Sequence, residues 1–144
     1  MLHDPTFRNS IEARLKALRP DAPRKWGRMN PDQMLWHVNQ FLTWAIGEES
    51  AERQKNPIPA PLLKFFVLYM PWPTSAPTHK NALAKGDYDF DAERERCLAL
   101  IGRFASRPLD GPWPEDPAFG SVTGKFTSKL QAKHLDYHFR QFSG

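Results

Sequence analysis

The distribution of proline constrains this chain more than any other feature of its sequence. Fourteen of the 144 residues are proline, roughly twice the usual share. Six lie between Pro57 and Pro77, and four lie between Pro108 and Pro117. Because proline lacks a backbone N–H and its ring clashes with the preceding helical turn, neither region can form a long helix. Extended regular structure must therefore come from the stretches that have no interior proline.

Four such stretches have the apolar periodicity of amphipathic helices. The second has the clearest start: Asn30 can cap a helix, Pro31 suits its first position, and Gln33 completes a capping box. We expect Thr6 to cap the first helix and Thr123 to cap the fourth. No stretch alternates apolar and polar residues long enough to predict a sheet. The predicted helices cover about residues 7–18, 31–45, 89–104 and 124–142.

These helices predict an all-α fold, a four-helix bundle in a single domain over residues 1–144. A long crossover connects the second predicted helix to the third. Its proline-rich part, residues 57–77, carries many large apolar side chains, so it must pack on something. Within it, Phe65 to Tyr69 is expected to form a short helix or a packed loop. The segment would lie across one end of the bundle or at a subunit interface.

Composition excludes several classes of protein. The net charge of +4 and the pI near 9.4 would suit nucleic-acid binding, but the basic residues are scattered, so we do not expect it. A single cysteine, Cys97, excludes an internal disulfide framework and fits a reducing compartment. We find no signal-peptide pattern and no apolar run of membrane-spanning length. The sequence therefore predicts a cytoplasmic protein with no membrane association.

Three of the five histidines form a candidate metal site. His134 and His138 stand at positions i and i+4 of a predicted helix, which places both imidazoles on one face. His37 lies on the core side of the second predicted helix, where a lone imidazole would need a polar partner. Three imidazoles converging from two helices can bind one divalent ion, with zinc or nickel the best fit, and leave a position for substrate. The alternative is ordinary buried histidines bonded to neighbours such as Gln33 or Gln141.

The remaining polar candidates are weaker. Gln33, Tyr137 and Gln141 lie within a turn of the three histidines and could orient them or contact a substrate, although packing and capping are also adequate roles. His3, near the terminus, and His79, in a Pro/Ser/Thr-rich loop, are expected to be solvated, with a position near the histidine site as the alternative for His79.

Two segments resemble the DinB-like superfamily. Residues 26–37, WGRMNPDQMLWH, look like its motif at the second helix, and residues 133–142, KHLDYHFRQF, are similar to the C-terminal motif of one uncharacterised branch. Pro117 to Gly120 also fits that branch, whereas residues 51–109 match mainly in length and apolar character. The resemblance implies a four-helix bundle with a long crossover. It also implies a divalent metal held by one histidine of the second helix and a His-x-x-x-His pair of the fourth, which here are His37, His134 and His138.

Some members of this superfamily are metal-dependent enzymes that use low-molecular-weight thiols. The first hypothesis is therefore a metal-dependent thiol S-transferase or hydrolase that acts on a small thiol or electrophile. The second is a metal-binding bundle without turnover, which serves as a stress-linked binding or assembly module. Cys97 is expected to be a packed, inert thiol. Trp36 and Trp44, on a different face of the second helix from His37, indicate either lateral packing or a homodimer interface.

Overall fold

The computed structural model describes residues 1–74 and 78–142, and within them all regular secondary structure is helical. The predicted all-α class is therefore confirmed. The last residues of the 57–77 segment, 75–77, lie outside the described residues. In chain order the elements are α1 (Pro5–Ala17), α2 (Pro31–Ala45), α3 (Ala60–Tyr69), a short 3-10 turn η1 (Lys80–Ala82), α4 (Phe90–Ser106) and α5 (Gly124–Arg140).

Local capping sets the start of each long helix. The predicted capping box of α2 is present, with the backbone N–H of Asn30 donating to Gln33 Oε1 at 2.9 Å. Thr123 caps α5 as expected, since its hydroxyl accepts from the backbone N–H of Phe126. The expectation for α1 was wrong: Asp4, not Thr6, is the cap and accepts from the backbone N–H of Thr6. An aspartate directly before a proline suits the start of a helix in two ways. Its carboxylate can act as the cap, and the proline is favoured at the first helical position.

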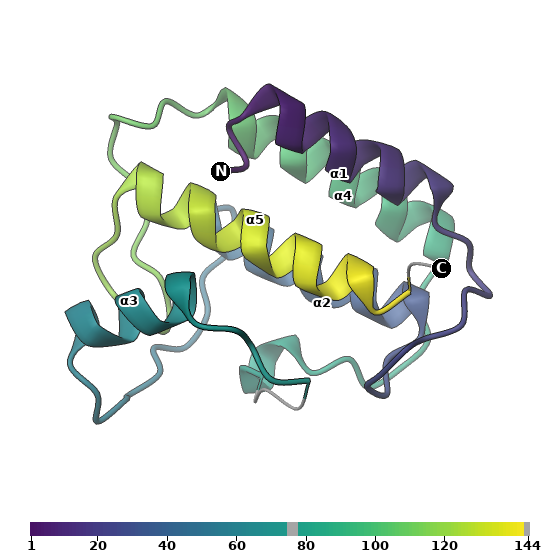
Figure 1. Ribbon diagram of the computed structural model, residues 1–144, viewed down its shortest axis with the longest axis horizontal. Helices are drawn as coiled ribbons and strands as arrows, with labels where there is room; N and C mark the ends of the chain where they lie inside the picture. Colours follow the sequence, from purple (N-terminus) through teal and green to yellow (C-terminus); the bar gives the residue numbers. More distant parts are fainter. Residues whose placement is uncertain (75–77, 143–144) are drawn as a thin grey trace.

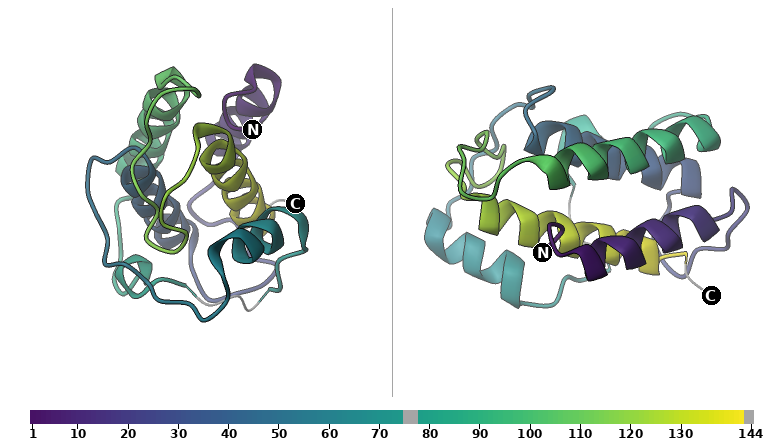
Figure 2. Two further views of the ribbon diagram at one scale, coloured as in Figure 1. Left: turned by 90° about the vertical axis from the view of Figure 1, so that its left-hand side faces the viewer. Right: turned by 90° about the horizontal axis from the view of Figure 1, so that it is seen from above.

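The helices α1, α2, α4 and α5 enclose the core (Figures 1 and 2). Helix α2 packs against α4 and α5, and α1 packs against the same two helices. The side chains between them are aliphatic and aromatic, and their burial supplies the main stabilisation of the fold. The largest fully buried ones are Phe104, Leu2, Ile11, Leu15, Met34, Leu35, Leu42, Leu100, Ile101 and Leu135.

The segment between α2 and α4 contains a fifth helix, α3, which packs against α5 (Figures 1 and 2). Of the two forms expected for Phe65 to Tyr69, the structure has the helix, and it begins earlier because Pro61 is tolerated in the first turn. Lys133 of α5 donates from Nζ to three carbonyls at the other end of α3, those of Val67, Leu68 and Met70 (2.9, 3.2 and 2.6 Å). A cation there satisfies carbonyls that have no partner within the helix.

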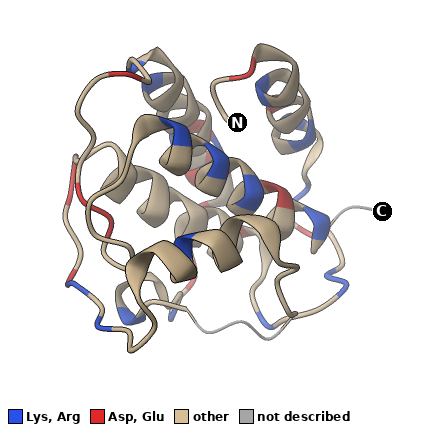
Figure 3. Ribbon diagram, turned by 60° about the vertical axis from the view of Figure 1, so that its left-hand side comes forward, with Lys and Arg blue, Asp and Glu red and all other residues tan. Residues whose placement is uncertain are grey.

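Much of the α3 surface is apolar and exposed. Lys64 is its only charged residue (Figure 3), and none of its residues is buried. The exposed large side chains at α3 and its C-terminal end are Leu62, Phe65, Phe66, Tyr69 and Met70.

The N-terminus corrects one expectation. His3 is half-buried and fixed in place, not freely solvated: its Nδ1 lies 2.8 Å from Ser128 Oγ and its Nε2 lies 2.7 Å from the carbonyl of Arg107. Its ring also packs against Phe104, and Leu2 is fully buried. These residues fasten the start of the chain to α4 and α5. None of the helices in the described part of the chain combines the length and apolar character that crossing a membrane requires.

Candidate metal centre

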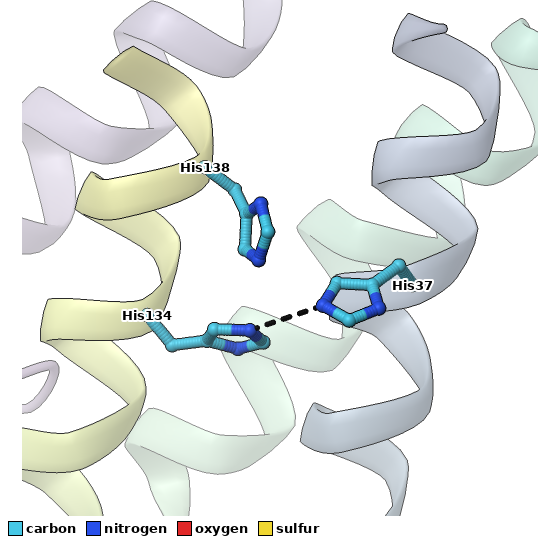
Figure 4. Close-up of side chains that lie close together, drawn as sticks. All are labelled: His37, His134 and His138. Carbon is cyan, nitrogen blue, oxygen red and sulfur yellow. Dashed lines mark hydrogen bonds between the residues drawn. The ribbon is translucent and has the colours of Figure 1, made fainter. Parts of the chain in front are cut away.

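The three histidines predicted as ligands meet between α2 and α5. His37 comes from α2, and His134 and His138 come from successive turns of α5. One ring nitrogen of each lies within 4.8 Å of the others, and the rings are directed toward one another (Figure 4). Their exposed fractions are 2%, 9% and 6%, respectively. The site is therefore inside the protein, at the contact between two helices.

The positions of these rings follow from helical periodicity. Met34 lies about one turn before His37 on α2 and Val38 directly follows it, and both are fully buried in the core. The imidazole of His37, on the same side of the helix, therefore faces inward as well. On α5, Leu130 and Leu135 are likewise buried. The contact of α2 with α5 then brings together residues that are 97 positions apart in the chain.

Hydrogen bonds at Nδ1 orient two of the rings. His37 Nδ1 lies 2.9 Å from the backbone carbonyl of Ala82 in η1, and because a carbonyl only accepts, this nitrogen carries the proton. His138 Nδ1 donates in the same way to Gln141 Oε1 at 2.7 Å. In a neutral imidazole the other nitrogen then has a free lone pair. Both Nε2 atoms are thus in the form that binds a metal.

The spacing of the nitrogens tests whether the site fits a metal ion. His37 Nε2 and His134 Nε2 are 3.3 Å apart. Two nitrogens at about 2.1 Å from a tetrahedral ion would be about 3.4 Å apart, so this pair already has a suitable separation. Without an ion, the same distance suits a hydrogen bond from the Nε2–H tautomer of His134 to His37. The donor set, three neutral imidazoles, fits borderline metals such as zinc and nickel.

Burial keeps all three imidazoles neutral. Removal from water lowers the pKa of His37, although the carbonyl of Ala82 opposes that shift. Burial, with the neighbouring charges of His138 and His37, lowers the pKa of His134 well below its usual value. For His138, burial followed by the charge of His37 lowers the pKa to about 3. Protons therefore compete weakly with a metal ion for these nitrogens.

Of the three further candidates, the structure places two at the histidines. Gln141 holds His138 as described above. Tyr137 packs its ring edge-on against His138, with the centroids 5.0 Å apart, and its hydroxyl donates to the carbonyl of Pro73. Gln33 lies elsewhere: its amide bridges the backbone of Asn30 and the carbonyl of Gly86. Its role is to cap α2 and to join it to the segment before α4.

Comparisons with models of protein families, with curated proteins and with solved structures found no match to this chain.

A cavity of about 620 Å³ adjoins the three histidines, a size that suits a small-molecule site. The proline-rich segment and α3 form one wall of it, which the sequence did not indicate. Trp72 lies against His134, with the ring centroids 5.9 Å apart, and Phe41 packs on the same imidazole at 4.6 Å. These aromatic rings give the histidines an apolar, poorly hydrated surrounding.

Two polar residues of the cavity were missed or misplaced by sequence analysis. His79 was expected to be solvated but is buried, with Nε2 bonded to the carbonyl of Glu52 and Nδ1 accepting from the N–H of Asn81. Asp116 also lines the cavity, and burial raises the pKa of its carboxyl group. Its position directly before Pro117, in the second proline-rich region, is the signal in the sequence that could have drawn attention to it.

Among the described residues, Cys97 and the two tryptophans of α2 make no ring contact or hydrogen bond with the three candidate ligands, His37, His134 and His138. Cys97 is fully buried in the core, and burial, reinforced by the charge of Glu93, raises the pKa of its thiol to about 12. The expectation of a packed, inert thiol is consistent with this. Trp44 is buried against Phe41 and His79, and Trp36 stacks on Tyr88 at 4.9 Å. Both therefore have packing roles within the chain, and a homodimer stays a prediction.

Proposed function

We propose that this chain is a cytoplasmic DinB-like protein, a four-helix bundle with an additional crossover helix, and a metal-dependent enzyme of the thiol S-transferase or hydrolase type. His37, His134 and His138 would hold a divalent ion, zinc or nickel. The observation that carries the proposal is the convergence of three buried imidazole nitrogens within 4.8 Å. The pairwise packing of α1, α2, α4 and α5 supports the bundle.

The hydrogen bonds around the histidines support metal binding over an incidental cluster. An ordinary buried histidine is satisfied at both nitrogens, as His79 is. His37 and His138 use Nδ1 for oxygen acceptors outside the cluster and turn Nε2 toward the other histidines, where the partner of His37 Nε2 is another imidazole, His134. This arrangement, in which an oxygen acceptor fixes the tautomer of each ligand, is typical of protein metal sites.

A divalent ion on three neutral imidazoles would keep its full charge and supply Lewis-acid activation of a water molecule or a thiol. The chain itself would do the rest. Ala82 and Gln141 hold two of the rings in position, while Phe41 and Trp72 exclude water from the imidazoles. The adjoining cavity would receive a small thiol or electrophile.

The cavity also favours an enzyme over the alternative, a metal-binding bundle without turnover that serves as a stress-linked binding or assembly module. A non-catalytic site would have no need of space beside the ligands, whereas a cavity of about 620 Å³ lies next to these. A rate measurement separates the two functions directly. Zinc-loaded protein should accelerate either the reaction of cysteine with 1-chloro-2,4-dinitrobenzene or the hydrolysis of 4-nitrophenyl acetate, and His134→Ala should abolish the acceleration. Zinc binding without acceleration of either reaction would favour the module.

Elemental analysis of the purified protein tests the metal itself. We expect about one divalent ion per chain in the unaltered protein and a loss of most of it in His37→Ala and in His134→Ala. His79→Ala is the matched control, because that imidazole is also buried but has both nitrogens bonded elsewhere. Unchanged metal content in the first two variants, with folding verified by circular dichroism, would overturn the proposal. We do not propose nucleic-acid binding, and insensitivity of the protein's mobility to added DNA would be consistent with this.

A further inference from the structure

The cavity beside the histidines has an almost uncharged lining. With the three candidate ligands neutral, only Arg28 and Asp116 carry a formal charge among its described lining residues, and Arg28 is exposed to solvent. Asp116 is already engaged, because its Oδ1 accepts from the backbone N–H groups of Ala118 and Phe119. Most of the wall is apolar and aromatic, and includes Phe41, Val67, Met70, Trp72, Phe119 and Leu130. Such a wall favours a ligand with a large apolar surface, and aromatic rings favour stacking with another ring.

One buried side-chain oxygen of this wall has no partner among the described residues. Gln131 lies on α5, one turn before His134, and lines the cavity although only 2% of the residue is exposed. Its Oε1 is buried and accepts no hydrogen bond from the part of the chain that the structure describes. A buried carbonyl oxygen without a donor is unfavourable, and native proteins leave few such atoms unexplained. Because Gln131 lines the cavity, a ligand there that carries an N–H or O–H group would satisfy this oxygen once the amide group turns toward it.

Two contacts attach the cavity wall formed by α3 and the segment after it to α5. Lys133 holds the end of α3 through its carbonyls, and Tyr137 holds the following segment through the carbonyl of Pro73. Both residues are on the helix that also carries Gln131, His134 and His138. One rigid element therefore positions the wall, the unpaired acceptor and two of the imidazoles, so that a ligand would contact all three together.

We propose that this cavity binds an uncharged, ring-containing small molecule that donates one hydrogen bond to Gln131 Oε1. This inference rests on the proposed function for the metal ion at one end of the cavity. It deepens that function by naming the chemical class of the substrate. The apolar contacts and the bond to Gln131 do not themselves require the metal. Binding can therefore be measured on metal-free protein.

Titration calorimetry with a matched pair of probes tests the inference. We expect 2-naphthol, which has a hydroxyl donor, to bind chelator-treated protein at one site per chain. It should bind about five- to tenfold more tightly than 2-methoxynaphthalene, which has the same rings but no donor. In Gln131→Met, which keeps the chain length of the residue but removes the oxygen, the two probes should bind equally, with the affinity for 2-methoxynaphthalene retained.

Two control variants keep the result interpretable. Ala118→Trp, which fills the cavity, should abolish binding of both probes. Phe65→Ser combined with Tyr69→Ser removes exposed apolar rings of α3 that do not line the cavity (53% and 61% exposed), and should leave both affinities unchanged. Circular dichroism and thermal unfolding identify any variant that fails to fold, and Gln131→Leu then replaces Gln131→Met. Loss of binding in the α3 variant would place the probes on the outer surface and overturn the inference.

The outcome is separable from that of the proposed function, because zinc content is measured on the same preparations. Zinc binding without 2-naphthol binding would overturn the inference alone. Binding of 2-naphthol with the expected preference, in protein that binds no zinc, would support the inference and overturn the metal site. An equal affinity of the unaltered protein for both probes, or a preference that persists in Gln131→Met, would overturn the assignment of Gln131 as the acceptor.

Discussion

His138 donates a hydrogen bond from Nδ1 to Gln141 Oε1 at 2.7 Å, three residues further along the chain. The bond spans the end of α5, where Gln141 is the C-cap residue. It fixes both the tautomer and the ring orientation of His138, so that Nε2 faces His37 and His134 (Figure 4). Gln141, which is not itself a candidate ligand, thus determines whether His138 Nε2 is ready to bind a metal ion.

Replacing Gln141 should therefore weaken zinc binding without removing a ligand. For Gln141→Leu we expect the zinc affinity to fall by about 10- to 100-fold, the usual effect of losing the hydrogen-bond partner of a ligating histidine. Competition with a chromophoric chelator measures this affinity. Gln33→Leu is the matched control, because Gln33 caps α2 instead. It should lose about 1 kcal/mol of stability and keep its zinc affinity, and an equal loss of affinity in both variants would contradict the assignment.

The stability of the metal-free protein should fall as the pH is lowered below 7. Burial lowers the pKa of all three histidines in the folded state, to about 3 for His138, whereas in the unfolded chain they titrate near 6.5. Below that pH the unfolded chain binds protons that the folded chain does not, so acid favours unfolding. Each histidine contributes up to ~1.4 kcal/mol per pH unit to this slope.

Urea unfolding at pH 7, 6 and 5 in the presence of a chelator measures the slope. His37→Leu should reduce it, since one of the three groups no longer titrates on unfolding. The change in slope is the informative quantity, because the substitution also leaves the carbonyl of Ala82 without its donor and lowers the stability at every pH. A slope identical to that of the unaltered protein would show that His37 is not held neutral.

The Cys97 thiol should not react in the folded protein. Because burial raises its pKa to about 12, almost none of it is thiolate at neutral pH, and the side chain is inaccessible. We expect labelling by a disulfide reagent to be on the order of 1,000-fold slower in buffer than in urea. Cys97→Ala should retain its zinc. Rapid labelling of the folded protein, or loss of zinc in this variant, would mean that the sulfur belongs to the site.

Local sequence signals were sufficient to predict most of the helices. The capping box from Asn30 to Gln33 and the cap at Thr123 act through hydrogen bonds to residues at most three positions away, so the sequence contains all that they require. The three histidines were predictable for a similar reason, because helical periodicity turns each toward the core. Asp4 was overlooked as a cap because Thr6 offered a competing signal two residues later.

Contacts between distant segments could not be predicted in this way. His3 and His79 resemble solvated loop residues, but Ser128 in one case and Glu52 in the other are their hydrogen-bond partners from distant parts of the chain. The cavity depends on Lys133 binding the end of α3, and no periodic pattern encodes this contact. Gln131 likewise becomes a candidate only once its amide oxygen is found buried without a donor.

X-ray absorption at the zinc edge of the loaded protein tests the central claim most directly, because it identifies the atoms around the ion. We predict three imidazole nitrogens at about 2.0–2.1 Å and no sulfur, with the imidazole signal reduced in His138→Ala. A sulfur neighbour at about 2.3 Å, or an oxygen-only environment without imidazole scattering, would contradict a centre built from His37, His134 and His138.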